Sequence, residues 1–301
     1  MSRIHEALKK AEMERAVVEP VRIPLASNTQ KSSESAEQQI PSFRKAGPKS
    51  DTVASAPREH LDFDQLRISC THHHWHPHPN VNIFSDQSTG NGCAEQFRSL
   101  RSRLYQLRNS QNLQTLLVTS AVPGEGKTFV VLNLAQAIVR QPDRRALIID
   151  ADLRCSSLHE FMGAPQAPGL SDYLRGDADE SAVIQFGEFG QKSNLCLIPA
   201  GSKISNPSEL LSNGRIQTLL KRVAPAFDWI IIDSPPCVPV SDASVLADTA
   251  DGVLVVVKAG STSSTLVRKA RQELQKRNVV GVVMNAVQEK PLSYSPYIHP
   301  E

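Results

Sequence analysis

Residues 120–128 read Ser-Ala-Val-Pro-Gly-Glu-Gly-Lys-Thr and stand between a short apolar run and an amphipathic stretch. They fit the pattern G-x-x-x-x-G-K-[ST], with Ala121 in place of the first glycine. Gly124 and Gly126 allow the backbone to curl so that successive N–H groups face phosphate oxygens. A following helix would add the positive end of its dipole. The stretch therefore predicts a phosphate-binding loop, with a glycine turn that merely caps a helix as the alternative.

Each residue type in this loop suits a nucleotide bound with magnesium. The Lys127 ammonium would reach the β and γ phosphates, and the Thr128 hydroxyl would ligate Mg²⁺. Asn285 follows the last predicted strand, where contact with the adenine and capping of a turn are equally compatible with the pattern. The residues predicted to contact ATP are Pro123, Gly124, Glu125, Gly126, Lys127, Thr128 and Asn285.

Three carboxylates follow apolar runs that read as strands. Asp150 and Asp152 come after one run, and Asp233 comes after another. Carboxyl ends of parallel strands border the crevice where ligands bind in such sheets. Asp233 and Asp152 are therefore predicted to hold Mg²⁺ together with Thr128. Asp150 and Asp152 are predicted, with Lys127, to be catalytic, and the spacing does not show which of the two accepts a proton.

The rest of the pattern predicts the fold class. Apolar runs alternate with helical stretches, and the runs are continuous rather than alternating, as in parallel strands that are buried on both faces. We expect an α/β protein with a doubly wound, mostly parallel sheet of the P-loop NTPase type. The predicted strands span 116–119, 146–149, 195–198, 229–232, 253–257 and 279–284.

The composition limits the class of partner. The 301 residues carry 33 basic and 31 acidic side chains, so neither nucleic acid nor an anionic membrane is expected to bind the chain as a whole. The five cysteines form no C-x-x-C pair, which favours reduced thiols. The start of the chain is polar, and no apolar run approaches the ~20 residues that cross a bilayer. We expect a cytoplasmic protein.

Four regions follow from the pattern. Residues 1–17 read as a short amphipathic helix, which is either a docking helix or a fraying tail. Residues 18–90 are rich in proline and polar residues and are predicted to be a disordered linker, including the histidine tract at 72–78. Residues 91–289 form the predicted P-loop domain, and residues 290–301 form a predicted flexible tail.

The domain resembles the bacterial tyrosine kinases of capsule and exopolysaccharide synthesis, from about residue 93 to residue 287. Beyond the loop at 123–128, the stretch Ile-Asp-Ala-Asp-Leu-Arg at 149–154 is similar to the additional Walker A′ motif of that family. Further matches are Gly-Leu-Ser-Asp-Tyr-Leu at 169–174, Asn-Pro-Ser-Glu-Leu-Leu at 206–211 and Asp-Ser-Pro-Pro at 233–236. The resemblance implies an ATP-dependent protein-tyrosine autokinase, in which we expect Asp150 to help orient or deprotonate the tyrosine hydroxyl.

The resemblance also implies an assembly and an acceptor. Glu95, Arg98 and Arg101 match the family's E-x-x-R-x-x-R pattern, which implies contacts between subunits in a ring-like homo-oligomer. An ordinary surface ion pair on a helix is the alternative. The family phosphorylates tyrosines at its own C-terminus, which implies that Tyr294 and Tyr297 are the autophosphorylation sites.

The implied setting is the inner face of the cytoplasmic membrane. The expected partner is a membrane-embedded polysaccharide co-polymerase that activates the kinase. Two other functions remain open at this point: an ATPase switch of the cell-division or partitioning type, and a non-catalytic ATP-binding regulator of polysaccharide assembly. The first lacks support at Val122, where those ATPases carry a lysine.

Overall fold

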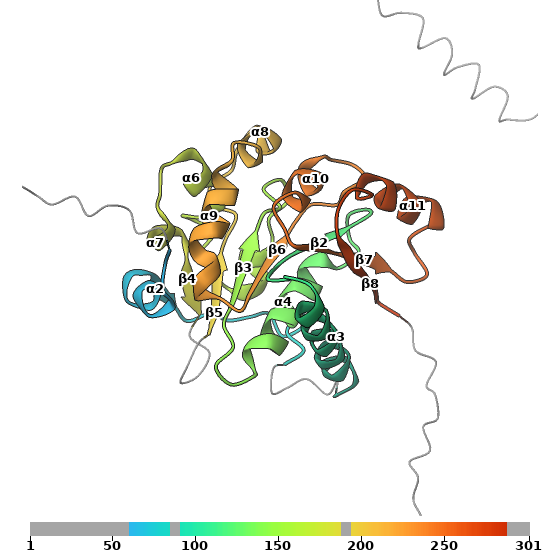
Figure 1. Cartoon of the computed structure of the whole chain (residues 1–301), viewed down its shortest axis with the longest axis horizontal. Helices are drawn as coiled ribbons and strands as arrows, with labels where there is room; N and C mark the ends of the chain where they lie inside the picture. The colour runs from blue at the N-terminus through green and yellow to red at the C-terminus, as the bar shows by residue number, and fades with distance from the viewer. Residues whose placement is uncertain (1–59, 85–90, 188–193, 288–301) are drawn as a thin grey trace, which may run out of the picture. The chain divides into compact units, whose positions relative to one another are not determined.

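The computed structural model describes residues 60–84, 91–187 and 194–287. One sheet of eight strands runs through this part of the chain, and in Figure 1 the labels from β4 to β8 follow its order from left to right. Only β4 and β5 pair antiparallel among the neighbouring strands. The order is β1 (Thr71–His73), β4 (Gln185–Gly187), β5 (Leu195–Ile198), β3 (Ala146–Asp150), β6 (Trp229–Asp233), β2 (Thr115–Ser120), β7 (Gly252–Lys258) and β8 (Val279–Asn285). The predicted mostly parallel α/β sheet is confirmed.

Two hydrophobic cores lie on the two faces of this sheet. Successive side chains of a strand point to opposite faces, so Leu117 belongs to one core while Leu116 and Val118 belong to the other. The first core is covered by α2 (Phe63–Ser69), α6 (Leu170–Arg175), α7 (Glu180–Val183), α8 (Pro207–Leu211), α9 (Arg215–Val223), α10 (Asp242–Ala247) and α11 (Ser264–Glu273). The second is covered by α3 (Asn91–Ser110), α4 (Lys127–Val139) and α5 (Leu158–Met162).

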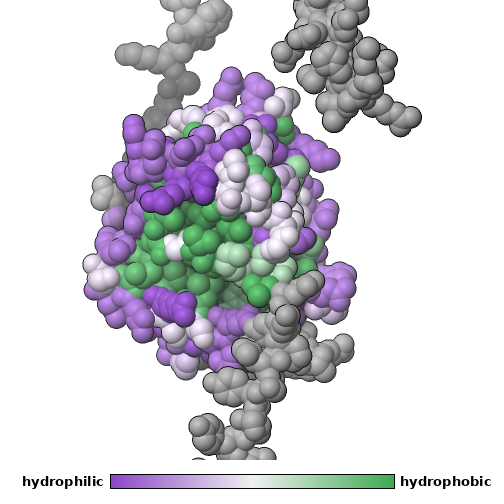
Figure 2. Space-filling view, turned by 90° about the vertical axis from the view of Figure 1, so that its right-hand side faces the viewer, coloured by the Kyte–Doolittle hydropathy of each residue, from purple (hydrophilic) through white to green (hydrophobic). Residues whose placement is uncertain are grey.

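The last strand departs from the predicted burial on both faces. Central strands β2, β3 and β6 are buried at every position, whereas β8 lies at the edge and alternates between exposed and half-buried residues. Figure 2 shows an apolar area on the side of the molecule where β8 lies. The exposed apolar side chains of this strand and the residues after it are Val279, Val282, Met284 and Val287.

The prediction of a linker over 18–90 is wrong for residues 60–84, which we call the strap. Helix α2 and strand β1 lie in the strap, and β1 pairs with β4. Its apolar residues are few and separated by polar ones, so the sequence shows no period. Phe63 and Leu66 nevertheless enter the first core, and Trp75 and Phe84 enter the second. Burial against an existing sheet therefore orders the strap, and residues 18–59 and 85–90 lie outside the described residues.

The histidine tract belongs to the strap. His72 and His73 lie in β1, and the His72 ring stacks on Phe186 at 5.2 Å between centroids. Within residues 60–84, 91–187 and 194–287, no three His, Cys, Asp or Glu side chains are grouped to hold a metal ion. None of the helices described is long and apolar enough to span a membrane. Residues 1–17 and the tail with Tyr294 and Tyr297 lie outside the described residues.

Candidate nucleotide site

The loop between β2 and α4 has the curled backbone that its sequence predicts. Gly124 and Gly126 adopt φ values of 78° and 91°, a left-handed conformation that favours glycine. A Cβ atom on Gly126 would lie 2.0 Å from the amide nitrogen of Asn285. The backbone angle therefore favours glycine at position 126, and a larger residue there would also displace the Asn285 side chain.

The side chain of Glu125 braces this loop. Its Oε2 atom accepts a hydrogen bond from the Val122 N–H at 2.8 Å, within the loop. Its Oε1 atom accepts from the Lys258 N–H and from the Thr262 hydroxyl, at the end of β7 and in the turn that follows. The side chain is buried and does not line the cavity beside the loop. Glu125 was predicted to contact the nucleotide. In the structure its carboxylate accepts hydrogen bonds from protein groups instead.

Asn285 contacts the same loop from the end of β8. Its side-chain nitrogen donates to the Glu125 carbonyl at 2.8 Å, and its own carbonyl accepts from the Ala259 N–H at 2.8 Å. Asn285 thus fixes the loop backbone directly. Contact with the adenine stays a prediction.

Lys127, Thr128 and Asp233 meet at the start of α4. The Thr128 hydroxyl donates to Asp233 Oδ2 at 2.6 Å, and Lys127 is buried in the wall of the cavity. Burial raises the pKa of the Asp233 carboxyl to about 6, although the hydrogen bond from Thr128 and the charge of Lys127 act in the opposite direction. The structure brings together the lysine, hydroxyl and carboxylate that the sequence predicted at the phosphates.

The two aspartates after β3 differ in their surroundings. Asp150 lies opposite Asp233 in the sheet, and its oxygens accept from the N–H groups of Asp152 at 3.2 Å and Leu158 at 3.3 Å. Burial, then the negative charges of Asp233 and Asp152, raise the pKa of Asp150 well above its usual value. Asp152 instead lines the cavity. Asp150 therefore binds the backbone of the loop after β3, and Asp152 faces the cavity.

The donor set fits a magnesium ion. Thr128, Asp152 and Asp233 offer hydroxyl and carboxylate oxygens, which are the ligands that Mg²⁺ prefers. The Oδ1 atom of Asp233 is buried and has no hydrogen-bond partner among the described residues. A cation here would give this oxygen a partner and would reduce the repulsion among the carboxylates.

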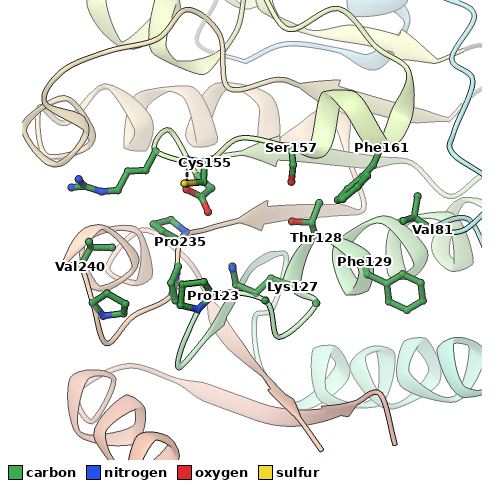
Figure 3. A pocket seen from close by; sticks show the side chains of 16 residues that line it. Val81, Pro123, Lys127, Thr128, Phe129, Cys155, Ser157, Phe161, Pro235 and Val240 are labelled. Carbon is green, nitrogen blue, oxygen red and sulfur yellow. Dashed lines mark hydrogen bonds between the residues drawn. The ribbon is translucent and has the colours of Figure 1, made fainter. Parts of the chain in front are cut away.

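The cavity beside the loop has a volume of about 470 Å³. Figure 3 shows Lys127 and Pro123 on one side of it, with Cys155, Ser157 and Phe161 across from them. No sequence pattern predicted that residues of the strap or of α5 would line a phosphate site. The residues that line the cavity are Val81, Pro123, Gly124, Gly126, Lys127, Thr128, Phe129, Asp152, Arg154, Cys155, Ser157, Phe161, Pro235, Pro236, Pro239 and Val240.

The three residues of the predicted interface, Glu95, Arg98 and Arg101, lie on α3 but have different contacts. Glu95 and Arg98 form an exposed ion pair one helical turn apart. The Arg101 guanidinium instead donates to the Ala137 carbonyl of α4 at 2.6 Å. Arg101 thus joins α3 to α4 within the chain, and Glu95 and Arg98 remain accessible.

The fold and the site define a class, a P-loop nucleotide-binding protein with an additional acidic loop after β3. The sequence comparison agrees, because a family model described as an AAA domain matches residues 114–277.

Similar proteins narrow this class. Tyrosine-protein kinase YwqD of Bacillus subtilis (strain 168) is 31% identical over 194 residues, which are 64% of this chain and 80% of YwqD. Tyrosine-protein kinase etk of Escherichia coli (strain K12) is 34% identical over 214 residues, 70% of this chain. The solved kinase domain of Escherichia coli ETK matches with a TM-score of 0.65 and 30% identity, over 75% of this chain and 88% of that domain. The chain therefore belongs to the bacterial tyrosine-protein kinases, and it spans 29% of the length of etk.

Proposed function

We propose that this chain is an ATP-dependent protein-tyrosine autokinase that acts in exopolysaccharide assembly. The observation that supports it best is the arrangement around one cavity of Lys127, Thr128, Asp152 and Asp233. Phosphoryl transfer depends mainly on positioning and on neutralisation of phosphate charge, with a carboxylate to orient the nucleophile. These four side chains supply those functions.

Each residue takes a defined part in the proposed reaction. Lys127 neutralises the β and γ phosphates of ATP. Thr128, Asp233 and one oxygen of Asp152 would hold Mg²⁺, which would supply further neutralisation of the phosphate charge. The tyrosine oxygen forms a bond to the γ phosphorus while the bond from that phosphorus to the β–γ bridging oxygen breaks, and ADP leaves. We reassign the proton acceptor from Asp150, the residue expected from the sequence, to the second oxygen of Asp152, because Asp152 lines the cavity and Asp150 does not.

The proposed acceptors are Tyr294 and Tyr297, in a second copy of the chain. The proposed homo-oligomer is ring-like and uses the exposed pair of Glu95 and Arg98, whereas Arg101 supports α3 from within. A membrane-embedded polysaccharide co-polymerase is the proposed activator, and it would hold the chain at the inner face of the membrane. These statements rest on the sequence resemblance to the family.

The test is a labelling experiment on the purified full chain with γ-labelled ATP and Mg²⁺, read by anti-phosphotyrosine antibody. Lys127→Met is expected to abolish the signal, and the double variant Tyr294→Phe/Tyr297→Phe to remove most of it. Lys221→Met, on an exposed face of α9, serves as the control and should label normally. Steady ATP hydrolysis without any phosphotyrosine would instead support an ATPase switch and refute the kinase.

A further inference from the structure

The exposed large apolar side chains gather at one edge of the sheet. In the part of the chain that the structure describes, four of them lie on β8 or directly after it, between 40% and 56% exposed, and these are Val279, Val282, Met284 and Val287. The other, Ile68, lies on α2. Figure 2 shows one continuous apolar area, bordered by hydrophilic residues, on the side of the molecule where β8 lies. An exposed apolar area of this kind marks an interaction site.

Strand β8 also has a free edge. It ends the order of the sheet and, among the described strands, pairs only with β7. Val282 and Met284 lie in register with Val255 and Val257 of the first core, yet they remain exposed. The strand reads Val-Val-Gly-Val-Val-Met-Asn, without the charged side chains or proline that usually keep a free edge from pairing. A partner can therefore bind this edge through side chains and through the backbone.

The apolar edge continues toward helix α3, which lies beside β8 in Figure 1. Asn278, directly before β8, donates from Nδ2 to Gln111 Oε1, directly after α3, at 3.2 Å. Half-buried apolar side chains of both elements pack against the second core, and these are Leu100, Leu107, Val280 and Val283. Helix α3 also carries Glu95 and Arg98, the exposed pair of the proposed homo-oligomer contact. The apolar edge and this pair therefore belong to neighbouring elements.

The size and the charge of this edge favour a second copy of the chain as its partner. A stable interface buries about 800 Å² on each partner, and an exposed ion pair such as Glu95 with Arg98 contributes little stability. The proposed homo-oligomer therefore needs an apolar surface, and the described residues offer one at β8. Because β8 carries no charged side chain, the strand itself adds no repulsion between like charges when two copies meet.

The tail with the proposed acceptors begins at the same place. Val287 is the last described residue, and Tyr294 and Tyr297 stand seven and ten positions further along the sequence. An extended chain spans about 3.3–3.6 Å per residue, so the two tyrosines can lie up to about 25 Å and about 35 Å from Val287. A copy packed against β8 is therefore within reach of both tyrosines.

We propose that the apolar edge at β8 is a subunit interface of the homo-oligomer, and that the copy covering it phosphorylates the tail that begins there. Val279, Val282, Met284 and Val287 are buried when this interface forms. The inference rests on the proposed autokinase function. It adds an apolar surface to the proposed contact of Glu95 and Arg98, and it identifies the neighbour that receives the tail.

The first experiment measures the mass of the purified full chain in solution by light scattering at micromolar concentration. The wild type should be an oligomer. Val282→Glu should raise the dissociation constant about a hundredfold, because it places an unpaired carboxylate in the interface, and should leave a monomer. Ile68→Glu, an equivalent change at the exposed apolar residue of α2, is the matched control and should keep the wild-type mass. Both variants should bind a fluorescent ATP analogue with wild-type affinity, which shows that they fold.

The second experiment follows labelling from one copy to another. Lys127→Met chains, which keep the tail tyrosines, are mixed with Tyr294→Phe/Tyr297→Phe chains, which keep the nucleotide site, and γ-labelled ATP is added with Mg²⁺. The Lys127→Met chains should be labelled. Val282→Glu in the Lys127→Met chain should lower this labelling about tenfold, because that chain no longer binds the copy that receives its tail. Ile68→Glu in the same chain should leave the labelling unchanged.

Two results would overturn the inference. One is a monomeric wild type, which would mean that another segment or another partner covers the edge. The other is a Val282→Glu chain that assembles and is labelled like the wild type. Absence of any phosphotyrosine from the wild type, assembled or not, would instead overturn the proposed function.

Discussion

Replacement of Glu125 by glutamine tests whether the phosphate-binding loop depends on a brace outside the cavity. Both carboxylate oxygens accept hydrogen bonds, one from Val122 and the other from Lys258 and Thr262. Glutamine keeps the shape of the side chain but has one acceptor oxygen and a donor NH₂ group. Whichever way the amide turns, at least one buried N–H faces a donor.

The size of the effect follows from these bonds. A hydrogen bond to a charged group contributes about 1.5–3 kcal/mol, so the free energy of unfolding should fall by about 2 kcal/mol. In a domain of this size, each kcal/mol moves the Tm by about 2–4 °C, which gives an expected loss of about 4–8 °C. Because the loop must be ordered before it binds phosphate, the Kd for ATP should rise about tenfold.

The assays are thermal unfolding of the unliganded protein and titration with a fluorescent ATP analogue. Glu273→Gln makes the same change at an exposed carboxylate at the end of α11 and should leave both values unaltered. If Glu125→Gln unfolds at the wild-type temperature and binds ATP normally, the carboxylate is not what holds the loop, and the proposed brace is wrong.

Three further changes test other parts of the structure. Burial raises the pKa of Asp242, but hydrogen bonds from Arg154 and its neighbours outweigh it and hold that pKa below its usual value. The resulting stability is therefore present at neutral pH and is lost as the pH falls through that lowered pKa. Asp242→Asn should cost about 2 kcal/mol at pH 7, and the Tm difference from the wild type should narrow below about pH 4. Asn133 is buried and bonds the strap at both its oxygen and its nitrogen, so Asn133→Ala should cost about 2 kcal/mol and speed proteolysis within residues 60–84. Alkylation of Cys155, in the cavity wall, should slow about tenfold at ATP–Mg²⁺ near ten times its Kd, while Cys93, exposed on α3, should react unchanged.

The sequence predicted the central strands and the phosphate-binding loop because both leave strong local patterns. Strands β2, β3 and β6 are buried on both faces, so they appear as unbroken apolar runs. The loop needs glycine at fixed positions for its backbone angles. Such features depend on neighbours in the chain and can be identified without a structure.

The strap depends on contacts between residues far apart in the sequence. Asn133 holds the strap through Ile83 and Val81, some fifty residues earlier in the chain. Strand β1 consists of Thr71 to His73, and its polar residues become a strand only because β4 offers an edge for pairing. A short stretch of sequence does not contain both the strap residues and the residues of α4 and β4 that they contact. Composition alone therefore assigned these residues to a linker.

The spacing of Asp150 and Asp152 in the sequence also could not predict that their side chains lie in different surroundings. Side chains two residues apart on a strand point to the same face of the sheet, but β3 ends at Asp150 and the chain turns before Asp152. Asp150 then remains buried and bonds the turned backbone, while Asp152 reaches the cavity. The pattern located both carboxylates at the site, and the end of the strand decided their separate positions.

The braces around the site explain how one cavity can hold like charges close together. Asp150 and Asp233 lie side by side, and burial and mutual repulsion disfavour their ionised forms. A ligand with phosphates adds charge of the same sign, so Lys127 and a bound cation must balance it. Repulsion would spread these loops if the loops were held only by groups inside the cavity. Glu125 and Asn285 fix one loop from outside, and the Arg154–Asp242 pair fixes the other. Lys127 and Asp152 can therefore interact with the ligand, because other side chains hold the two loops in position.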